Sequence, residues 1–321
     1  MQISVLIVGL GQIGIGYDYD LNPEEFILTH ARASSVHKKF HLVGGVDSNP
    51  VKREKLEMRY QCASYATLDL ALKNLKADMV VVATPTDTHP EVINQIFSSY
   101  SPKAILCEKP IAYEKKDTVK ILELCRRNQT KLYVNYHRRS DAGSLKIKQM
   151  LSELPEDERV KGVCWYSKGI INNGSHFINL LKFWLGEVKD FSVIQNGRMW
   201  NQTDPEPDVF FQFEKGDIVF LAANEENFSH YTIEIVSSKG RIRYDFGGRK
   251  IFWQPKMENP NKSGYTYLRD DVEQVKNDLN FAQLNVYEQI YLDMQNRKAE
   301  FCCGEEALDV VKILDKVRAK L

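Results

Sequence analysis

The sequence lacks an excess of charge of either sign, because 43 lysine and arginine residues balance 43 aspartate and glutamate residues. It also lacks a long basic tract, which is the usual footprint of a nucleic-acid-binding surface. No hydrophobic run approaches the ~20 residues of a membrane-spanning helix. We therefore expect that neither nucleic acid nor a membrane is a partner of this chain.

Cysteine is sparse: the chain has six cysteines, and none forms a Cys-x-x-Cys pair. This scatter argues against a disulfide framework and is typical of reduced thiols in the cytoplasm. The adjacent residues Cys302 and Cys303 have no other close ligands in the sequence, so we expect no metal site. The first apolar run has no basic segment before it and no small-residue cleavage site after it. We therefore interpret it as part of a cytoplasmic protein, not as a signal peptide.

What the sequence does contain, at its start, is an apolar β-branched run at residues 3–8 that leads directly into a Gly-x-Gly-x-x-Gly turn. In a dinucleotide-binding turn the first glycine permits a tight bend and the second lets the backbone approach the pyrophosphate. The third allows close helix–strand packing, and the following helix N-terminus offers N–H groups to the phosphates. The sequence therefore predicts a cofactor-binding turn formed by Gly9, Gly11, Gln12, Ile13 and Gly14.

Strand-like and helix-like segments alternate through the first 135 residues, which predicts βαβ units and a mostly parallel sheet. Right-handed crossovers would place the carboxyl ends of the strands at one edge, where ligands bind. After the glycine turn, the expected strands are His41–Val46, Asp78–Ala83, Ala104–Cys107 and Lys131–Asn135, and the expected helices are Pro50–Arg59, Pro90–Ser98 and Glu114–Asn128.

Asp47 ends the second expected strand and bears on the choice of cofactor. Its carboxylate would accept hydrogen bonds from the adenosine ribose and repel a 2′-phosphate, which favours NAD. NADP stays open, because Ser48 and Asn49 could hydrogen-bond a 2′-phosphate. Asp47 lies 33 residues after the last glycine of the turn, compared with the usual ~20, which indicates a loop inserted at residues 16–28. This loop either lines the active site, with Tyr17 near the substrate, or is only a longer solvated loop.

From about residue 155 the pattern changes to alternating apolar and polar residues separated by turn signals, which predicts a large, mainly antiparallel sheet. Two helical patterns, Val272–Arg297 and Glu305–Leu321, follow it. The expected strands are Val160–Tyr166, Val188–Gln195, Val209–Phe213, Ile218–Ala222, Tyr231–Ser237, Ile242–Phe246 and Ile251–Gln254.

The predicted fold is therefore α/β with two domains. Residues 1–135 would form a doubly wound Rossmann domain that binds NAD(P), onto which the C-terminal helices could pack back. Residues 136–321 would form an α+β domain, built on an open sheet, for substrate binding and oligomerisation.

Three further segments resemble the signature positions of one enzyme family. They are the turn at residues 84–89, Glu108-Lys109-Pro110 and Gly174-x-His176. With the glycine turn, Asp47 and Arg138-Arg139, in this order along the chain, they resemble the Gfo/Idh/MocA oxidoreductases, named for glucose–fructose oxidoreductase and inositol dehydrogenase. The resemblance implies NAD(P)-dependent redox chemistry at a hydroxyl-bearing carbon of a sugar, a cyclitol or a related compound. It also implies that the cofactor is lined by Thr84, Pro85, His89, Glu108 and Lys109.

In this family the lysine of Glu-Lys-Pro lies between nicotinamide and substrate, and the proline is commonly cis. The resemblance therefore implies that Lys109 lies between nicotinamide and substrate and that the peptide bond before Pro110 is cis. An ammonium beside the reacting oxygen would stabilise a developing alkoxide, and a rigid strand end would hold it in place. Outside this motif, a lysine at a strand end would be interpreted as a solvated surface charge.

The family's third motif is usually Asp-x-Gly-x-His-x-x-Asp, and here both carboxylates are replaced by amides, Asn172 and Asn179. His176 is present, and we predict that it exchanges the substrate's hydroxyl proton, because imidazole titrates near neutral pH. Asn172 can orient a substrate by hydrogen bonds but cannot supply an aspartate's charge. Either this branch works with Lys109 and His176 alone, or redox activity has been weakened or lost. We favour the first, because both residues and the complete glycine turn are present.

Further substrate-binding candidates follow from position. They are His137, Arg138, Lys168 and Asn173, with His30 as a weaker one. The segment from Tyr166 to His176 resembles a variant found in bacterial surface-polysaccharide pathways, which implies a sugar or nucleotide-sugar substrate. The rival hypothesis is a cofactor-binding regulator without turnover, because this fold also serves in a transcriptional corepressor. An exposed sheet face would favour a homodimer or a homotetramer.

Overall fold

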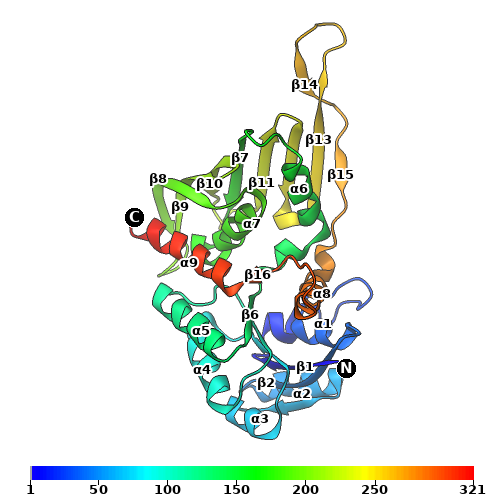
Figure 1. Ribbon diagram of the computed structural model, residues 1–321, viewed down its shortest axis with the longest axis vertical. Helices are drawn as coiled ribbons and strands as arrows, with labels where there is room; N and C mark the ends of the chain where they lie inside the picture. Colours follow the sequence, from blue (N-terminus) through cyan, green and yellow to red (C-terminus); the bar gives the residue numbers. More distant parts are fainter. Residues whose placement is uncertain (1) are drawn as a thin grey trace. The chain divides into compact units, whose positions relative to one another are not determined.

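The structure is a computed structural model that describes residues 2–321, and its chain divides into two compact units. The first unit extends to Ser140 and also contains Asn280–Lys312, whereas the second contains Asp141–Leu279 and Ile313–Leu321. The chain leaves the first unit slightly after the boundary expected at residue 135 and later returns to it. The returning segment includes α8 (Ala282–Met294), which lies beside α1 (His30–Val36) (Figure 1).

A seven-stranded sheet forms the middle of the first unit, in the order β16-β6-β5-β4-β1-β2-β3. Neighbouring strands are parallel, except that β16 pairs antiparallel with β6. The strand order reverses at β1, which pairs with both β2 and β4, and doubly wound sheets bind ligands at such a point. The strands are β1 (Ile3–Val8), β2 (Phe40–Val46), β3 (Ala63–Tyr65), β4 (Met79–Val82), β5 (Ala104–Cys107), β6 (Lys131–Val134) and β16 (Cys302–Cys303).

The helices of this unit begin where the sequence provides caps. The Asn49 side chain accepts the N–H of Val51 at 2.9 Å, with Pro50 as the first helical residue of α2, an arrangement that suits a helix start. No helix within residues 2–321 is long and apolar enough to cross a membrane. Besides α1 and α8, the helices are α2 (Pro50–Tyr60), α3 (Leu68–Asn74), α4 (His89–Ser99), α5 (Lys115–Arg127) and α9 (Gly304–Arg318), of which α9 extends into the second unit.

The second unit contains a nine-stranded sheet in the order β14-β13-β12-β11-β7-β10-β9-β8, with β15 beside β13. Its pairs are antiparallel except for β7 with β10, so the predicted fold class is confirmed. The strands are β7 (Val160–Tyr166), β8 (Val188–Met199), β9 (Pro205–Phe213), β10 (Gly216–Ala222), β11 (Thr232–Ser237), β12 (Gly240–Asp245), β13 (Lys250–Glu258), β14 (Thr266–Leu268) and β15 (Glu273–Val275).

Two helices, α6 (Ala142–Ser152) and α7 (Ser175–Leu185), cover one face of this sheet (Figure 1). Alternate residues of β12 are buried beneath them, and the Trp184 ring meets the edge of Tyr244 with 5.4 Å between ring centroids. The Trp184 indole N–H donates to the Ser144 carbonyl at 3.1 Å, which joins α7 to α6. Every residue of α7 is buried, and this explains why its sequence is mostly apolar.

The helix expected at Val272–Arg297 is wrong in its first part. Residues 273–275 form β15, which pairs with β13, and a 3-10 turn at Leu279–Phe281 precedes α8. The free edge of β13 offers backbone hydrogen bonds to this segment, and such tertiary pairing overrides a weak helical pattern. The helix expected directly after the glycine turn is interrupted by the inserted loop, as the spacing to Asp47 indicated. It is a single π-helical turn, Gln12–Gly16, and α1 begins only at His30.

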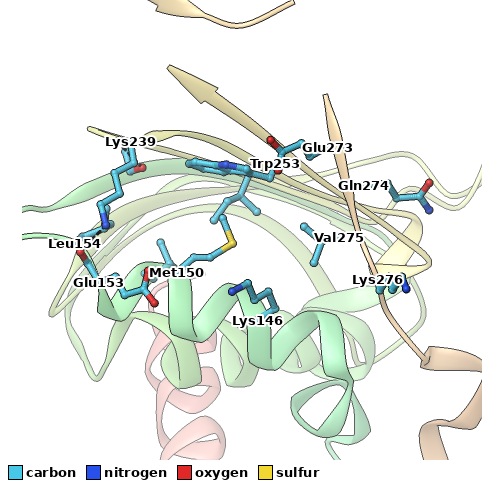
Figure 2. A pocket seen from close by; sticks show the side chains of 13 residues that line it. Lys146, Met150, Glu153, Leu154, Lys239, Trp253, Glu273, Gln274, Val275 and Lys276 are labelled. Atoms are coloured by element: carbon cyan, nitrogen blue, oxygen red, sulfur yellow. Dashed lines mark hydrogen bonds between the residues drawn. The ribbon is translucent and has the colours of Figure 1, made fainter. Parts of the chain in front are cut away.

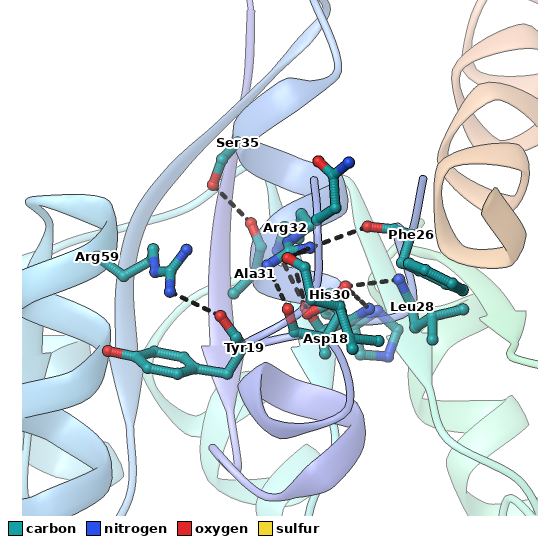
Figure 3. Close-up of polar contacts among 12 residues, drawn as sticks. Asp18, Tyr19, Phe26, Leu28, His30, Ala31, Arg32, Ser35 and Arg59 are labelled. Carbon is teal, nitrogen blue, oxygen red and sulfur yellow. Dashed lines mark hydrogen bonds and ion pairs between the residues drawn. The ribbon is translucent and has the colours of Figure 1, made fainter. Parts of the chain in front are cut away.

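The inserted loop between these two elements is organised around a buried ion pair, Asp18 and Arg32 (Figure 3). The Asp18 carboxylate accepts the N–H of Leu28 at 2.6 Å and the N–H of Thr29 at 3.0 Å. The Arg32 guanidinium donates to the carbonyls of Asp18, Leu21 and Phe26. Because these groups belong to the loop's own backbone, satisfying the two buried charges also determines the course of the loop.

We expect Asp18→Asn to lower the free energy of unfolding by about 3 kcal/mol, because it leaves the buried Arg32 without its counter-charge. Urea denaturation followed by tryptophan fluorescence measures this loss. The matched control is Asp20→Asn in the same loop, where the side chain is exposed and the change should stay within about 0.5 kcal/mol. Equal stability of the two variants would contradict a structural role for the ion pair.

Two carboxylates meet at the beginning of α6. Asp141 accepts the N–H of Ser144 at 2.9 Å and that of Asp278 at 2.9 Å, and Asp278 accepts the N–H of Ala142 at 2.8 Å. Burial raises the pKa of Asp141 to about 7; the backbone N–H donors act against this rise, and the adjacent Asp278 carboxyl adds to it. The folded state therefore holds a proton that the unfolded chain releases near pH 4.

This difference predicts that stability falls as the pH rises from 5 to 8. A folded pKa above the unfolded value gives a stabilisation that is complete below the unfolded pKa and is lost as the pH passes the folded pKa, at up to about 1.4 kcal/mol per pH unit. Urea denaturation at pH 5, 6, 7 and 8 measures the slope. In Asp278→Asn we expect a shallower slope, because the second carboxyl is gone; an unchanged slope would count against the pair as its source.

Candidate functional site

The glycine turn has the shape that a dinucleotide phosphate requires. Gly9 has φ +99°, and a Cβ there would lie 2.5 Å from the Ala83 carbonyl oxygen; a Cβ on Gly14 would overlap the Gly9 carbonyl. A Cβ on Gly11, in contrast, would meet no atom within 4 Å. The first and third glycines are thus needed for packing between backbone segments. The second leaves an open backbone face that a pyrophosphate can approach.

A cavity of about 540 Å³ lies against this open face, at the carboxyl ends of β1, β2 and β4. It is therefore at the point where the strand order reverses, and its residues fit the adenosine and pyrophosphate half of a dinucleotide. It is lined by Val8, Gly9, Gly11, Val46, Asp47, Ser48, Lys52, Ala66, Thr67, Leu68, Ala83, Thr84 and Pro85. The predicted residues Gly9, Gly11, Asp47, Thr84 and Pro85 thus line one cavity.

Asp47 is held at the rim of this cavity by three donors. Its carboxylate accepts the N–H of Leu10 at 3.0 Å and that of Asn49 at 2.9 Å, and it pairs with the Lys52 ammonium at 3.1 Å. Partial burial raises the pKa of Asp47, but these donors outweigh it and hold the pKa below its ordinary value. The carboxylate is therefore ionised at neutral pH, as a partner for ribose hydroxyls must be. Lys52, which the sequence analysis did not single out, places a cation at the same rim.

His89 is buried within the first unit and does not line the cavity. Its Nε2 lies 2.9 Å from the Thr84 carbonyl, and its Nδ1 lies 3.1 Å from the Ile111 carbonyl. Burial lowers the pKa of His89, against the effect of these carbonyls. The imidazole thus supports the turn at Thr84, which itself lines the cavity, and connects it with the segment after Pro110.

Glu108 and Lys109 directly follow β5, and the peptide bond between Lys109 and Pro110 is cis, as expected. The Glu108 carboxylate lies 2.9 Å from His30 Nε2 and accepts the Asn135 amide N–H at 2.5 Å. Burial raises the pKa of Glu108, but His30, Asn135 and the Lys109 ammonium outweigh it, so the pKa lies below its ordinary value. An ionised carboxylate therefore stays beside Lys109. His30, a weaker candidate in the sequence, is fully buried as its partner.

The predicted residues His137 and Arg138 begin a 3-10 turn, His137–Ser140, shortly after β6. Burial, followed by the positive charge of Arg138, lowers the pKa of His137 to about 3. The ring is therefore neutral at pH 7 and can both donate and accept a hydrogen bond, as a sugar hydroxyl requires. The next residue, Arg139, pairs with Glu306 at 2.7 Å, which connects this turn to α9.

In the second unit, the predicted motif forms a π-helical turn, Gly169–Gly174, that continues into α7. His176 lies in the first turn of α7 and is 6% exposed, and Asn179 is buried one turn later. The Asn173 amide donates to the Ser167 carbonyl at 3.2 Å and to the Tyr231 hydroxyl at 3.1 Å. Lys168, before the turn, pairs with Glu225 at 2.9 Å, so its charge already has a partner within the unit.

Sequence reasoning missed two residues that hold this turn, Asp204 and Glu206. The Asp204 carboxylate accepts the N–H groups of Ile171 and Asn172, and the Glu206 carboxylate accepts that of Gly169. The one available signal was acidic residues at alternate positions in an otherwise apolar strand, Asp-x-Glu-x-Asp at residues 204–208.

Other predicted features lie outside these contacts. Tyr17 is 57% exposed after the glycine turn. Within residues 2–321, no group of three or more potential metal-ligating side chains is arranged to hold an ion.

A separate cavity of about 640 Å³ lies between α6 and strands β12, β13 and β15, where Trp253 and Met150 face one another across the space (Figure 2). It contains none of the predicted site residues.

Comparison with known proteins agrees with this geometry. Residues 3–136 match the family model Gfo/Idh/MocA, described as an oxidoreductase family with an NAD-binding Rossmann fold. Residues 3–136 therefore match the NAD-binding domain of this family, and the resemblance inferred from the motifs is confirmed. The first unit is an NAD(P)-binding Rossmann domain.

Individual relatives extend the comparison. The chain is 31% identical over 153 residues to the inositol 2-dehydrogenase of Rhizobium meliloti (strain 1021), covering 48% of this chain and 42% of that protein. It is 28% identical over 120 residues to the 2,7-anhydro-N-acetylneuraminate hydratase of Escherichia coli (strain K12), covering 37% of this chain and 29% of that protein. The matched region thus spans less than half the length of these two curated relatives.

A solved structure covers both units. The WlbA dehydrogenase of Bordetella pertussis, in complex with NADH and UDP-GlcNAcA, matches with a TM-score of 0.75 and 17% identity, over 99% of this chain and 95% of that chain. This likeness extends the shared fold to the second unit.

The contacts of Asp47 predict the outcome of Asp47→Asn. We expect NADH to bind roughly 10-fold more weakly, a loss of about 1.4 kcal/mol, because the charged acceptor for the ribose hydroxyls is gone. NADPH should bind more tightly, since Lys52 is released toward a 2′-phosphate. Fluorescence titration with both cofactors measures the ratio of dissociation constants. The control is Glu54→Gln, exposed on the same helix as Lys52, and a ratio that moves equally in both variants would contradict the assignment.

Proposed function

We propose that this protein is an NAD(P)-dependent oxidoreductase that transfers a hydride between the cofactor and a secondary hydroxyl or ketone of a sugar, cyclitol or nucleotide sugar. The observation that carries the proposal is the combination, within the first unit, of the cavity at Gly11 with Lys109 and the ionised Glu108 at the next strand ends. A cofactor cavity alone would suit many functions, but a lysine beside a buried carboxylate at this edge suits redox chemistry on an oxygen-bearing carbon.

The residues divide the work as follows. The glycine turn and Asp47 would hold the pyrophosphate and the adenosine ribose. The Lys109 ammonium would stabilise the alkoxide that forms when the hydroxyl proton leaves, and the ionised Glu108 precedes it in the chain. His176 would take the proton in one direction and return it in the other. The nicotinamide, when bound, supplies the hydride acceptor or donor.

The substrate class follows from the hydrogen-bonding groups. Neutral His137, Asn172 and Asn173 offer donors and acceptors of the kind that hydroxyl groups bind, and Arg138 offers a planar set of donors suited to a carboxylate or phosphate. This combination supports a sugar that carries an anionic group, such as a nucleotide sugar of a surface-polysaccharide pathway. The ligand of the WlbA structure belongs to this chemical class. We further propose a cytoplasmic homodimer or homotetramer and a preference for NAD through Asp47.

The test is NADH formation at 340 nm with NAD and a panel of free sugars, inositols and nucleotide sugars. We expect Lys109→Ala and His176→Gln to lower kcat by roughly 10²–10⁴-fold and to change NADH affinity by less than about threefold. Lys115→Ala, exposed at the start of α5, is the control and should retain full activity. NADH accumulates in a net oxidation but not in a hydration, because a hydration leaves the cofactor unchanged at the end of turnover.

The regulator hypothesis predicts a different pattern. Tight NADH binding without turnover of any panel member, unaffected by Lys109→Ala or His176→Gln, would favour a regulator over the enzyme. Turnover that persists in both variants would overturn the proposed roles of the two residues while leaving the oxidoreductase intact.

A further inference from the structure

The turn that carries Asn172 is held from β9 and the residue before it. Asp204 is 4% exposed, and its two carboxylate oxygens accept the N–H of Ile171 at 2.9 Å and the N–H of Asn172 at 2.8 Å. Glu206 is 1% exposed; it accepts the N–H of Gly169 at 3.1 Å and pairs with Arg198 at 2.6 Å. Two buried carboxylates therefore bind three backbone N–H donors, those of Gly169, Ile171 and Asn172, at the start of one helical segment.

The backbone of the turn is shaped to receive Asp204. Gly169 has φ +79°, and a Cβ at this position would overlap the Asp204 carboxylate. Lys168, just before it, also has a left-handed conformation, with φ +65°. The chain thus enters the turn through two residues with positive φ, and the absence of a side chain at 169 gives the space that the carboxylate occupies.

These contacts have an electrostatic consequence. The first N–H groups of a helical segment have no partners within it and form its positive end. A carboxylate is the acceptor that binds them most strongly. Asn172 provides no charge of its own, whereas the family motif has an aspartate here. The carboxylates at this turn are instead those of Asp204 and Glu206, which contact its backbone N–H groups.

We infer that Asp204 is a positioning residue, whose carboxylate holds the backbone at 171–172 and so fixes the place of Asn172 and the direction of the helix that carries His176. The inference about turnover rests on the proposed function, but the anchoring itself does not. A displacement of about 1 Å in a group that transfers a proton can cost roughly 100-fold in rate. Loss of this anchor therefore affects kcat even though Asp204 touches neither reactant.

The first experiment needs no substrate. Hydrogen–deuterium exchange of the cofactor-free protein is compared for wild type and Asp204→Asn. In this variant an amide nitrogen replaces one carboxylate oxygen, so one of the two backbone N–H groups loses its acceptor. We expect exchange in residues 169–173 to rise by about 10-fold or more, with the other peptides of the second unit unchanged. The matched control is Asp208→Asn, four residues later in β9. Asp208 accepts the N–H of Ala222 at 2.8 Å, so the change should leave residues 169–173 as in wild type. Exchange that is unchanged in Asp204→Asn, or that rises equally in the control, overturns the inference.

The second experiment separates positioning from general stability. With the substrate found by the panel, Asp204→Asn should lower kcat by roughly 10–100-fold, while KM, NADH affinity and the melting temperature stay close to wild type. A kcat equal to that of wild type overturns the role in turnover.

If wild type turns over no substrate, the proposed function fails, and the exchange result still decides the anchoring. If Asp204→Asn does not fold, Glu206→Gln tests the same anchor through the N–H of Gly169, with increased exchange expected there and unchanged exchange overturning it.

Discussion

The structure depends on one constraint: a carboxylate removed from water must be surrounded by hydrogen-bond donors. Asp18 binds the backbone N–H groups of Leu28 and Thr29, and Asp47 binds that of Leu10. Asp204 binds those of Ile171 and Asn172. In each case the donors come from a loop, so satisfying the charge also fixes the loop. The loops held in this way are the inserted loop, the glycine turn and the turn before His176.

The same constraint gives neighbouring groups at the carboxyl ends of β5 and β6 different charges at neutral pH. Glu108 has donors and stays ionised, because His30, Asn135 and Lys109 together outweigh the effect of burial and hold its pKa below the ordinary value. His137 is partly removed from water and lies near two positive charges, Arg138 and Lys109, so its pKa is lowered and it stays neutral. One unit therefore places an ionised carboxylate and a neutral imidazole within a few residues of two adjacent strand ends.

Much of the architecture was predictable because its signals are local. The apolar runs at β4 and β5 and the alternation along β7 indicate strands without any knowledge of their neighbours. The turn chemistry of the glycine motif is equally local, since positive φ and close backbone approach select glycine. The prediction failed at residues 272–281, where the partner strand, β13, decides the conformation. It also left out β3, β14 and β16, because strands this short carry too little pattern to identify.

The residues of the candidate site also fall into those that local sequence indicates and those that long-range contacts decide. The sequence by itself determined the glycine turn, Asp47, Glu108-Lys109-Pro110 and His176, because each belongs to a short motif whose chemistry depends on neighbouring residues. Only the tertiary structure decided that His89 is a buried support and that His30 is the partner of Glu108. It also decided that Asp204 and Glu206 hold a turn about 30 residues earlier in the chain. These roles are long-range hydrogen bonds of buried polar groups, and no local pattern specifies which distant donor a carboxylate will meet.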